Sequence, residues 1–318
     1  MAQLETIPQW KVTMAFIAIY IVWGTTYLAI AYTLQGFPPF VLSAFRFSIA
    51  GVLLFLYCKF KGYKVPPLGT IMPSAISGTV ALVGGSGLVT WAEQYIGSGH
   101  AATVIACEPF LYILFERKMW RFYFSQKLII IGLIIGFAGL VLFSSSGTSH
   151  SNVNGMELIG NLVLLLSAVL WVGGSLYGKR VNTEAYSNTM VTSIQLMAAG
   201  IFSAFLAFPT GEWSRFSFDT ISLQAWGGLA YMVTMGSMVA FLAFTWLLTI
   251  RPPALVGTHT YVNPVVAVFA GWLFIGETFS LMQIIGLVII LIGVLLTKIP
   301  EYREMNILGK RKLSVDKN

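Results

Sequence analysis

Charged residues are scarce in this sequence: they make up 10% of the 318 residues, whereas 57% are hydrophobic. This balance is typical of a chain that is solvated mostly by lipid, so we expect an integral membrane protein. Cysteine is scarce too. Cys58 and Cys107 fall at unrelated positions inside apolar stretches, which predicts neither a disulfide framework nor a metal site. The HExxH, Walker A and dinucleotide-binding glycine patterns are absent, so we expect no metal, no cofactor and no ATP-driven reaction.

The apolar residues form ten stretches, each near the roughly 20 residues that one helical span of a bilayer requires. Uninterrupted runs such as LIIIGLIIGFAGLVLF favour helices over the alternating pattern of an outer-membrane barrel. The sequence therefore predicts an all-α integral membrane fold with ten transmembrane helices. We expect these helices near residues 12–32, 38–58, 70–90, 98–118, 126–144, 157–178, 187–209, 223–247, 253–274 and 279–298.

The net charge of +7 reflects where the basic residues fall between the apolar stretches. If the N-terminus is cytoplasmic, almost all of these residues lie on the cytoplasmic side, and only Arg215 lies outside. The positive-inside rule is then satisfied, so we expect a multi-pass protein of the cell membrane with both termini cytoplasmic and no nucleic-acid partner. The basic residues that this orientation places in the cytoplasm include Lys59, Lys61, Lys64, Arg117, Lys118, Arg121, Lys127, Lys179, Arg180 and the run KRK at 310–312.

The two halves of the chain repeat each other. WGTTY at 23–27 corresponds to WVGGSLY at 171–177, and TWAEQYIGSGHAATVIACEPF at 90–110 aligns without a gap on TWLLTIRPPALVGTHTYVNPV at 245–265. Because five spans is an odd number, the second unit enters the membrane from the opposite side, as in many secondary transporters. We expect the units to span residues 1–148 and 149–299, divided within the turn-rich segment 144–155, with a basic cytoplasmic tail at 300–318.

The order and spacing of these motifs resemble the EamA family of the drug/metabolite transporter (DMT) superfamily, most closely its YedA-type exporters. The segments that carry the resemblance are WGTTYLAI, PPFVLSAFRF, WAEQYIGSGHAA, WVGGSLYGKR and YVNPVVAVFAGWLFIGETFS. The resemblance implies ten helices in two inverted EamA repeats and a central cavity lined largely by spans 1, 3, 4, 6, 8 and 9. It also implies the export of small metabolites or amphiphilic compounds.

Glu108 is an acidic residue in the middle of an apolar stretch. It lies about ten residues, or about 15 Å, from either end of its expected span, at the bilayer midplane. Its repeat partner is Asn263, and the proline that follows each of them loosens the helix. An ionised carboxyl at this depth costs about 2.5–3.5 kcal/mol. Two interpretations remain open: a protonatable site for substrate or proton, or a structural partner for Arg46.

His259 lies one helical turn before Asn263 and shares its helix face. We expect it either to exchange a proton with Glu108 and contact a ligand, or to be a histidine satisfied between helices. Arg46 could attract an anionic substrate, or it could satisfy loop carbonyls and a neighbouring carboxylate.

Aromatic residues complete the predicted site. Trp23 and Tyr27 share one face of the first span, and Trp171 with Ser175 has the same spacing in the sixth. Aromatic walls suit flat or cationic ligands, although tryptophans near span ends also serve as interfacial anchors. The small-residue run LVGGSGLV at 82–89 predicts close packing of the third span against its neighbours.

These features together predict a secondary-active exporter of small molecules that works by alternating access in the lipid bilayer, as a monomer or homodimer, with protons as a candidate coupling ion. One alternative is an intramembrane serine protease, because Gly84-Gly85-Ser86-Gly87 and the spacing from His259 to Asn263 match rhomboid motifs, though in reversed order. A non-transporting scaffold or sensor would need a soluble output domain, for which the sequence offers no candidate segment.

Overall fold

The computed structural model describes residues 7–96, 101, 104–145, 155–181, 185–275 and 280–315, and every regular element among them is helical. Seven helical segments of this part of the chain are long and apolar enough to cross a membrane. The expected all-helical membrane class is therefore confirmed, and the protein is a multi-pass membrane protein. These segments are Gln9–Thr33, Pro39–Phe60, Leu68–Ala92, Leu158–Val181, Asn188–Leu206, Leu223–Ile250 and Leu281–Pro300.

The helices coincide with most of the expected spans. The elements are α1 (Gln9–Thr33), α2 (Pro39–Phe60), the continuous stack of α3 (Leu68–Gly78), η1 (Thr79–Gly87) and α4 (Leu88–Ala92), α8 (Lys127–Ser145), α9 (Gly155–Val181), α10 (Asn188–Leu206), and the second stack of α12 (Leu223–Tyr231), η4 (Met232–Ala240) and α13 (Phe241–Ile250).

The expected spans 98–118 and 253–274 are not single long helices. The first contains α6 (Glu108–Phe115), which follows a turn at 106–107, and its residues 97–100 and 102–103 lie outside the described part. The second is divided at Thr258 into α14 (Pro253–Gly257) and α15 (His259–Ile275). Between α6 and α8, η2 (Arg117–Met119) and α7 (Trp120–Ser125) lead into a 93° bend, which makes α8 an eighth candidate span if the bent pair counts as one.

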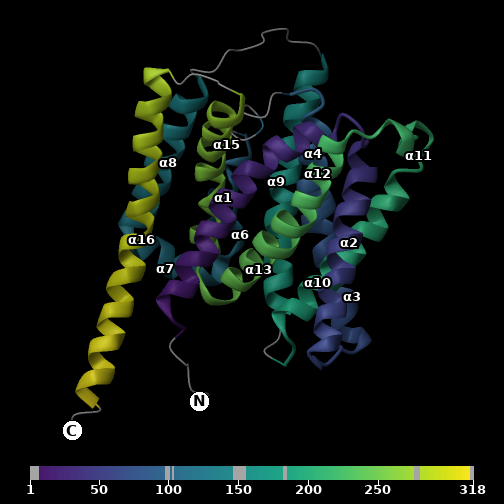
Figure 1. The fold of residues 1–318 in the computed structure, drawn as a ribbon. Coiled ribbons are helices and arrows are strands. Elements are labelled where there is room, and N and C mark those ends of the chain that lie inside the picture. The colour runs from purple at the N-terminus through teal and green to yellow at the C-terminus, as the bar shows by residue number, and fades with distance from the viewer. Residues whose placement is uncertain are drawn as a thin grey trace.

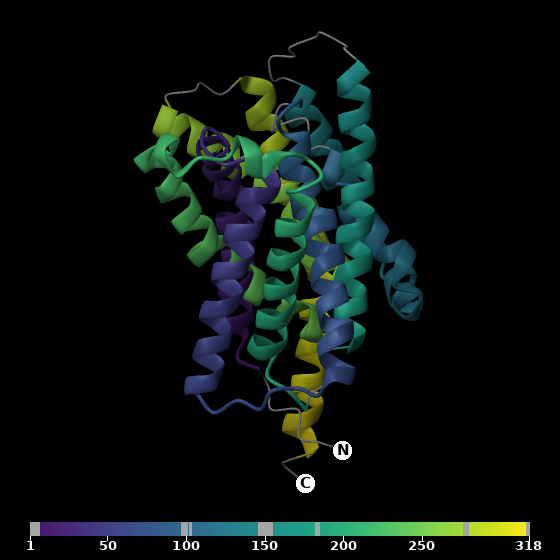
Figure 2. The same ribbon diagram turned by 90° about the vertical axis from the view of Figure 1, so that its right-hand side faces the viewer.

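The N-terminal end of α1 and the C-terminal end of α16 lie at the same end of the bundle (Figures 1 and 2). The connection between α2 and α3 and the C-terminus of α9 lie there too, and they carry Lys59, Lys61, Lys64, Lys179 and Arg180. We call this the basic end. The short helix α11 (Glu212–Arg215) lies at the opposite end, and η3 (Phe218–Thr220) follows it before α12.

The last helix is longer than expected. α16 (Leu281–Val315) continues through Pro300 into the segment that was expected to be a separate tail, while its apolar part ends at Pro300. The residues after Pro300 include many good helix formers, such as glutamate, arginine, lysine and leucine, which explains the continuation. The expected boundary between the two units, at 148/149, lies outside the described residues.

The start of α2 is capped by a residue from a distant segment. Neither Pro38 nor Pro39 supplies a capping side chain, but Glu212 Oε2 accepts hydrogen bonds from the backbone N–H groups of Phe40 at 2.7 Å and Val41 at 3.1 Å. A carboxylate is well placed at the positive end of a helix. Burial raises the pKa of Glu212, whereas these two donors and Arg215 act in the opposite direction. The loop that follows α10 is thereby fixed on α2.

Helices α8 and α16 pack side by side through glycines (Figure 1). A Cβ atom at Gly293 of α16 would lie closer than 3.0 Å to the backbones of Gly132 and Gly136 of α8. Such close backbone approach is how helices associate in lipid, where water does not drive apolar groups together. The two glycine-rich helices that close the two halves of the sequence are therefore each other's main partners.

We predict that Gly293→Ala destabilises the purified protein by about 1–3 kcal/mol, because the added methyl group overpacks the contact with α8. The measurement is the melting temperature in detergent. Gly227→Ala in α12 is the matched control, since a Cβ there meets no atom within 4 Å. Equal melting temperatures for the two variants would show that the glycine contact does not hold the helices together.

Candidate functional site

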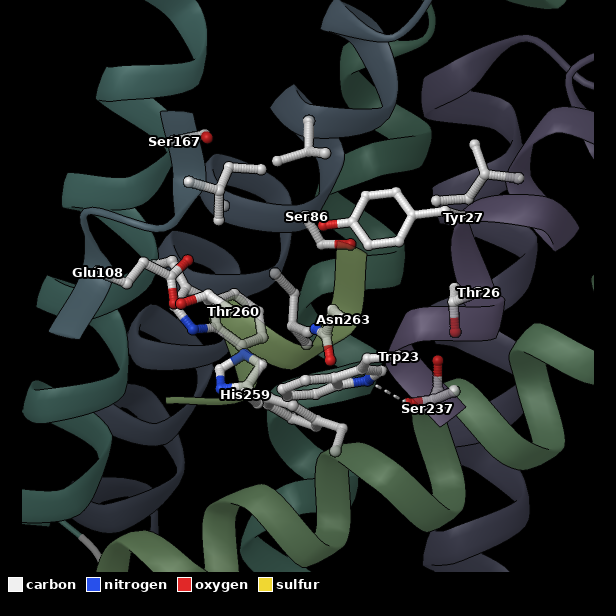
Figure 3. Close-up of a pocket in the computed structure, with 18 of the residues that line it drawn as sticks. Trp23, Thr26, Tyr27, Ser86, Glu108, Ser167, Ser237, His259, Thr260 and Asn263 are labelled. Atoms are coloured by element: carbon white, nitrogen blue, oxygen red, sulfur yellow. Dashed lines mark hydrogen bonds between the residues drawn. The ribbon is translucent and has the colours of Figure 1, made fainter. Parts of the chain in front are cut away.

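A cavity lies among the helices (Figure 3). Its walls come from α1, α2, η1, α4, α6, α9, η4, α13 and α15, which includes all six spans implied by the family resemblance and adds α2. The lining residues are Trp23, Thr26, Tyr27, Ile30, Arg46, Leu82, Gly85, Ser86, Val89, Ile105, Glu108, Ser167, Trp171, Gly236, Ser237, Phe241, His259, Thr260 and Asn263.

Most of the residues predicted from the sequence meet in this cavity. Seven of the eight predicted site residues line it, and only Ser175 does not. Ser175 lies one turn beyond Trp171 on α9 and lines a smaller space instead. Several hydroxyl groups were missed, among them Thr26, Ser237 and Thr260. Only Thr26 carried a usable signal, because it lies three residues after Trp23 on the same helix face.

Glu108 is held at the beginning of α6. The turn at 106–107 ends the preceding helical residues, and Pro109, which lacks an N–H group, follows as an early helical residue. The Glu108 side chain is 4% exposed, and its Oε2 atom has no hydrogen-bond partner. It reaches the cavity from the wall opposite Tyr27, whose ring points toward Ser86 (Figure 3). Glu108 is therefore a buried carboxyl with a free acceptor atom.

The structural interpretation of Glu108 as the partner of Arg46 is wrong for this conformation. No ion pair joins these two described residues, and the Nε atom of Arg46 donates to Ser237 Oγ at 2.9 Å instead. The guanidinium also lies 5.1 Å from the ring of Phe47, at the distance of a cation–π contact. Arg46 thus ties α2 to η4, and the cavity has one acidic and one basic group in different parts of its wall.

His259 and Asn263 are both partly occupied by the backbone. His259 Nδ1 lies 3.0 Å from the carbonyl oxygen of Val256, so Nδ1 carries the proton and Nε2 is left as an acceptor. The amide nitrogen of Asn263 donates to the carbonyls of His259 at 2.9 Å and Tyr20 at 3.1 Å when the amide is oriented to suit these acceptors. Asn263 therefore joins α15 to α1 as well as lining the cavity.

An aromatic layer bounds the cavity on the side of the basic end. The Trp23 ring lies at its centre, with centroids 5.5 Å from Trp171, 5.1 Å from Phe244 and 4.8 Å from His259. Trp23 Nε1 donates to the Gly236 carbonyl at 3.1 Å, which fixes the ring (Figure 3). The smaller space lies beyond these rings, and its lining residues are Ser77, Ala81, Ser175, Gly178, Lys179, Asn188, Gln195, Phe241, Phe244, Thr245 and Leu248. We call Trp23, Trp171, Phe241, Phe244 and His259 the aromatic floor.

Two π-helical segments line the cavity at matching places in the sequence repeat. η1 and η4 are both nine residues long, and each contributes small residues to the wall, such as Gly85 and Ser237. The sequence alignment had no signal for this geometry. π-Helical turns are rare and are frequent at functional sites. The expected close packing of the third span is confirmed, because a Cβ atom at Gly85 would lie 2.8 Å from the Trp171 ring.

Among the described residues, no group of three histidine, cysteine, aspartate or glutamate side chains could hold a metal ion. The polar groups of the cavity are hydroxyls, one amide, one imidazole, one carboxyl and one guanidinium. They can form hydrogen bonds and ion pairs with a small molecule, and the carboxyl and imidazole can exchange a proton.

Comparison with known proteins decides the family. The model of the EamA-like transporter family matches twice, at residues 9–145 and 158–299. This chain belongs to the EamA-like transporter family. It is 34% identical over 289 residues to the inner membrane transporter YedA of Escherichia coli K12, covering 91% of this chain and 90% of YedA. It is 24% identical to the transporter YoaV of Bacillus subtilis, covering 89% of this chain and 95% of YoaV.

A solved crystal structure has the same fold, with a TM-score of 0.74 and 19% identity over 92% of this chain and 98% of that one. The resemblance read from the sequence motifs is thus confirmed, and the two family matches correspond to the two halves of the internal repeat. The EamA relatives are transporters, so the intramembrane protease alternative is not favoured, although Ser86 and His259 line the same cavity.

We predict that Gly85→Ala weakens ligand binding in the cavity at least about tenfold, because the added methyl group displaces the Trp171 ring from the aromatic floor. The measurement is the dissociation constant by tryptophan fluorescence for any compound that the wild type binds. Gly87→Ala serves as the control, since its Cβ would meet neighbours only at 3.6 Å and beyond. Unchanged binding in Gly85→Ala would show that the position of the Trp171 ring does not affect ligand binding.

Proposed function

We propose that this protein is a secondary-active exporter of small metabolites or amphiphilic, drug-like compounds, working by alternating access. Its two halves act as inverted repeats around the central cavity, and both termini lie in the cytoplasm. The observation that carries the proposal is the cavity itself: a buried, mostly apolar space with a few convergent polar groups, in a chain of a transporter family. No enzymatic activity is part of the proposal.

The aromatic floor supports a two-state cycle. Rings from α1, α9, α13 and α15 separate the main cavity from the smaller space toward the basic end. Opening that floor requires movement of α1 and α9 relative to α13 and α15. Of these helices, α1 belongs to the first repeat, and the other three belong to the second. Close glycine packing between η1 and α9, at Gly85 and Gly174, lets these two helices slide against each other without long side chains between them.

The composition of the cavity wall indicates the type of substrate. Trp23, Tyr27 and Trp171 offer aromatic faces, which favour flat or cationic groups. Glu108 and Arg46 carry opposite charges on different helices and do not neutralise each other, so each is available to a polar end of a substrate. A small amphiphile with an aromatic body and at least one polar end suits this arrangement.

Glu108 is proposed as the coupling group. An ionised carboxyl inside the membrane domain is costly, by about 2.5–3.5 kcal/mol at mid-depth, and here no Arg46 ion pair compensates for it. Either a proton or a cationic group of the substrate can neutralise the carboxylate. Because only one of them can bind at a time, the site exchanges protons for substrate. Proton entry from the outside would then drive export of the compound.

We predict that Glu108→Gln loses accumulation driven by a pH gradient, because glutamine keeps the size and hydrogen bonding of the side chain without titrating. The protein is reconstituted in liposomes, and uptake of phenylalanine, adenine, glucose and ethidium is measured with protons as the only driving force. A thermal-shift assay with the same four compounds reports binding.

Glu212→Gln is the control, since this carboxyl caps α2 far from the cavity. Accumulation by Glu108→Gln at the wild-type level would contradict the coupling role of Glu108. Absence of any thermal shift or flux with the whole panel in the wild type would count against the proposed classes of substrate.

A further inference from the structure

Among the described residues, several side chains contain buried polar atoms without hydrogen-bond partners, and five of these atoms lie between the cavity and the basic end. They lie on two neighbouring helices, α6 and α9, and on Glu116, the residue that directly follows α6. Buried polar groups are nearly always hydrogen-bonded, so a cluster of exceptions requires an explanation. The atoms are Glu108 Oε2, Tyr112 Oη, Glu116 Oε2, Trp171 Nε1 and Ser175 Oγ.

Their spacing places them in two parallel rows. Glu108, Tyr112 and Glu116 follow one another at four-residue intervals, as do Trp171 and Ser175, and i,i+4 residues share one face of a helix. Each interval advances about 6 Å along the axis, so the α6 row spans about 12 Å, roughly 40% of a hydrocarbon core about 30 Å thick. Both helices run toward the basic end, where Arg117 follows Glu116.

The members of the rows face each other. Tyr112 is completely buried, and its hydroxyl interacts electrostatically with Glu108 and lies close to both Ser175 and the Trp171 indole, although neither contact has the geometry of a hydrogen bond. Further toward the basic end, Glu116 interacts electrostatically with Lys179 of α9. Ser175 and Lys179 also line the smaller space, which has room for a water molecule.

We propose that these side chains form a gated proton relay, in which Tyr112 and Ser175 pass protons between Glu108 and the pair of Glu116 and Lys179 at the basic end. The proposal rests on the proposed coupling role of Glu108 and adds the route by which its proton reaches the cytoplasmic side. It also gives a role to Ser175, which does not line the main cavity.

Each transfer along the relay conserves charge. When the Glu108 carboxyl gives its proton to Tyr112 Oη, the tyrosine releases its own proton to Ser175 Oγ or to water in the smaller space. The hydroxyl is neutral before and after, and no oxidant or reductant takes part. The proton ends on the Glu116 carboxylate, and its release to water restores the electrostatic attraction between Glu116 and Lys179. Glu108 is left ionised and ready for a cationic substrate group.

The relay is interrupted in the conformation described here. The hydroxyls of Tyr112 and Ser175 have no partners, so no continuous chain of hydrogen bonds joins Glu108 to Glu116. Opening of the aromatic floor beside Trp171 would let water complete it. The titratable or charged groups that face Glu108 are Tyr27 of α1, Cys107, Tyr112 and His259 of α15; those that face Glu116 and Lys179 are Tyr123 of α7 and Arg180.

The test is Tyr112→Phe, which keeps the buried ring and removes only the hydroxyl. Liposomes are loaded with the pH dye pyranine, a mixture of phenylalanine, adenine, glucose and ethidium is added, and the initial rate of compound-driven proton movement is recorded. We expect this rate to fall roughly 10²-fold, the lower end of what a positioned proton-transfer group contributes. The thermal shift caused by the mixture should stay at the wild-type value, and the residual rate should slow further in D₂O.

Tyr261→Phe is the matched control, because Tyr261 is also completely buried but its hydroxyl donates to the Leu133 carbonyl outside the relay. It should retain wild-type proton movement, and Ser175→Ala should show part of the loss seen in Tyr112→Phe. Wild-type proton movement in Tyr112→Phe together with its loss in Glu108→Gln would overturn the relay and leave the coupling role of Glu108 intact. Equal proton movement in Glu108→Gln and the wild type would overturn both.

Discussion

A carboxyl group inside a lipid-solvated helix bundle needs a proton, a cation or a cavity, and this requirement explains much of the structure around Glu108. The helix is interrupted just before it, Pro109 follows it, and a cavity opens in front of it. No cation of the described protein neutralises it, since Arg46 is bound to Ser237. The site therefore contains a carboxyl group that no basic side chain of the described residues neutralises, so its charge can be neutralised by a proton or by a cationic group of a ligand.

The rest of the bundle isolates that group from one side. The aromatic floor closes the cavity toward the basic end, with Trp23 fixed by the Gly236 carbonyl and in contact with Trp171 and His259. The π-helical segments η1 and η4 let small residues approach these rings from both halves of the repeat. In the proposed cycle, the same contacts that seal the floor are those that must separate, so the seal and the gate are one set of side chains.

Much of this was predictable from residues alone. The midplane position of Glu108 and its alignment with Asn263 brought both to one cavity, and the spacing of the tryptophans placed Trp23 and Trp171 in contact. What failed has a common physical cause: local sequence does not report the tertiary partner. Arg46 binds a serine on η4 instead of Glu108, and Ser175 faces the smaller space because it lies one helical turn beyond Trp171 toward the basic end. Nothing in the glycine-rich run distinguished a π-helix from an α-helix, and Pro300 does not end α16 although proline removes a helix hydrogen bond.

The central claim is that Glu108 is a titrating group in contact with the transported compound. The direct measurement is infrared difference spectroscopy of the reconstituted protein, which resolves the C=O stretch of a protonated carboxyl. The account predicts one such band that disappears as the pH rises, that shifts when a transported compound is added, and that is missing in Glu108→Gln. A spectrum in which Glu108→Gln and the wild type show the same bands at every pH, with and without compound, would contradict it.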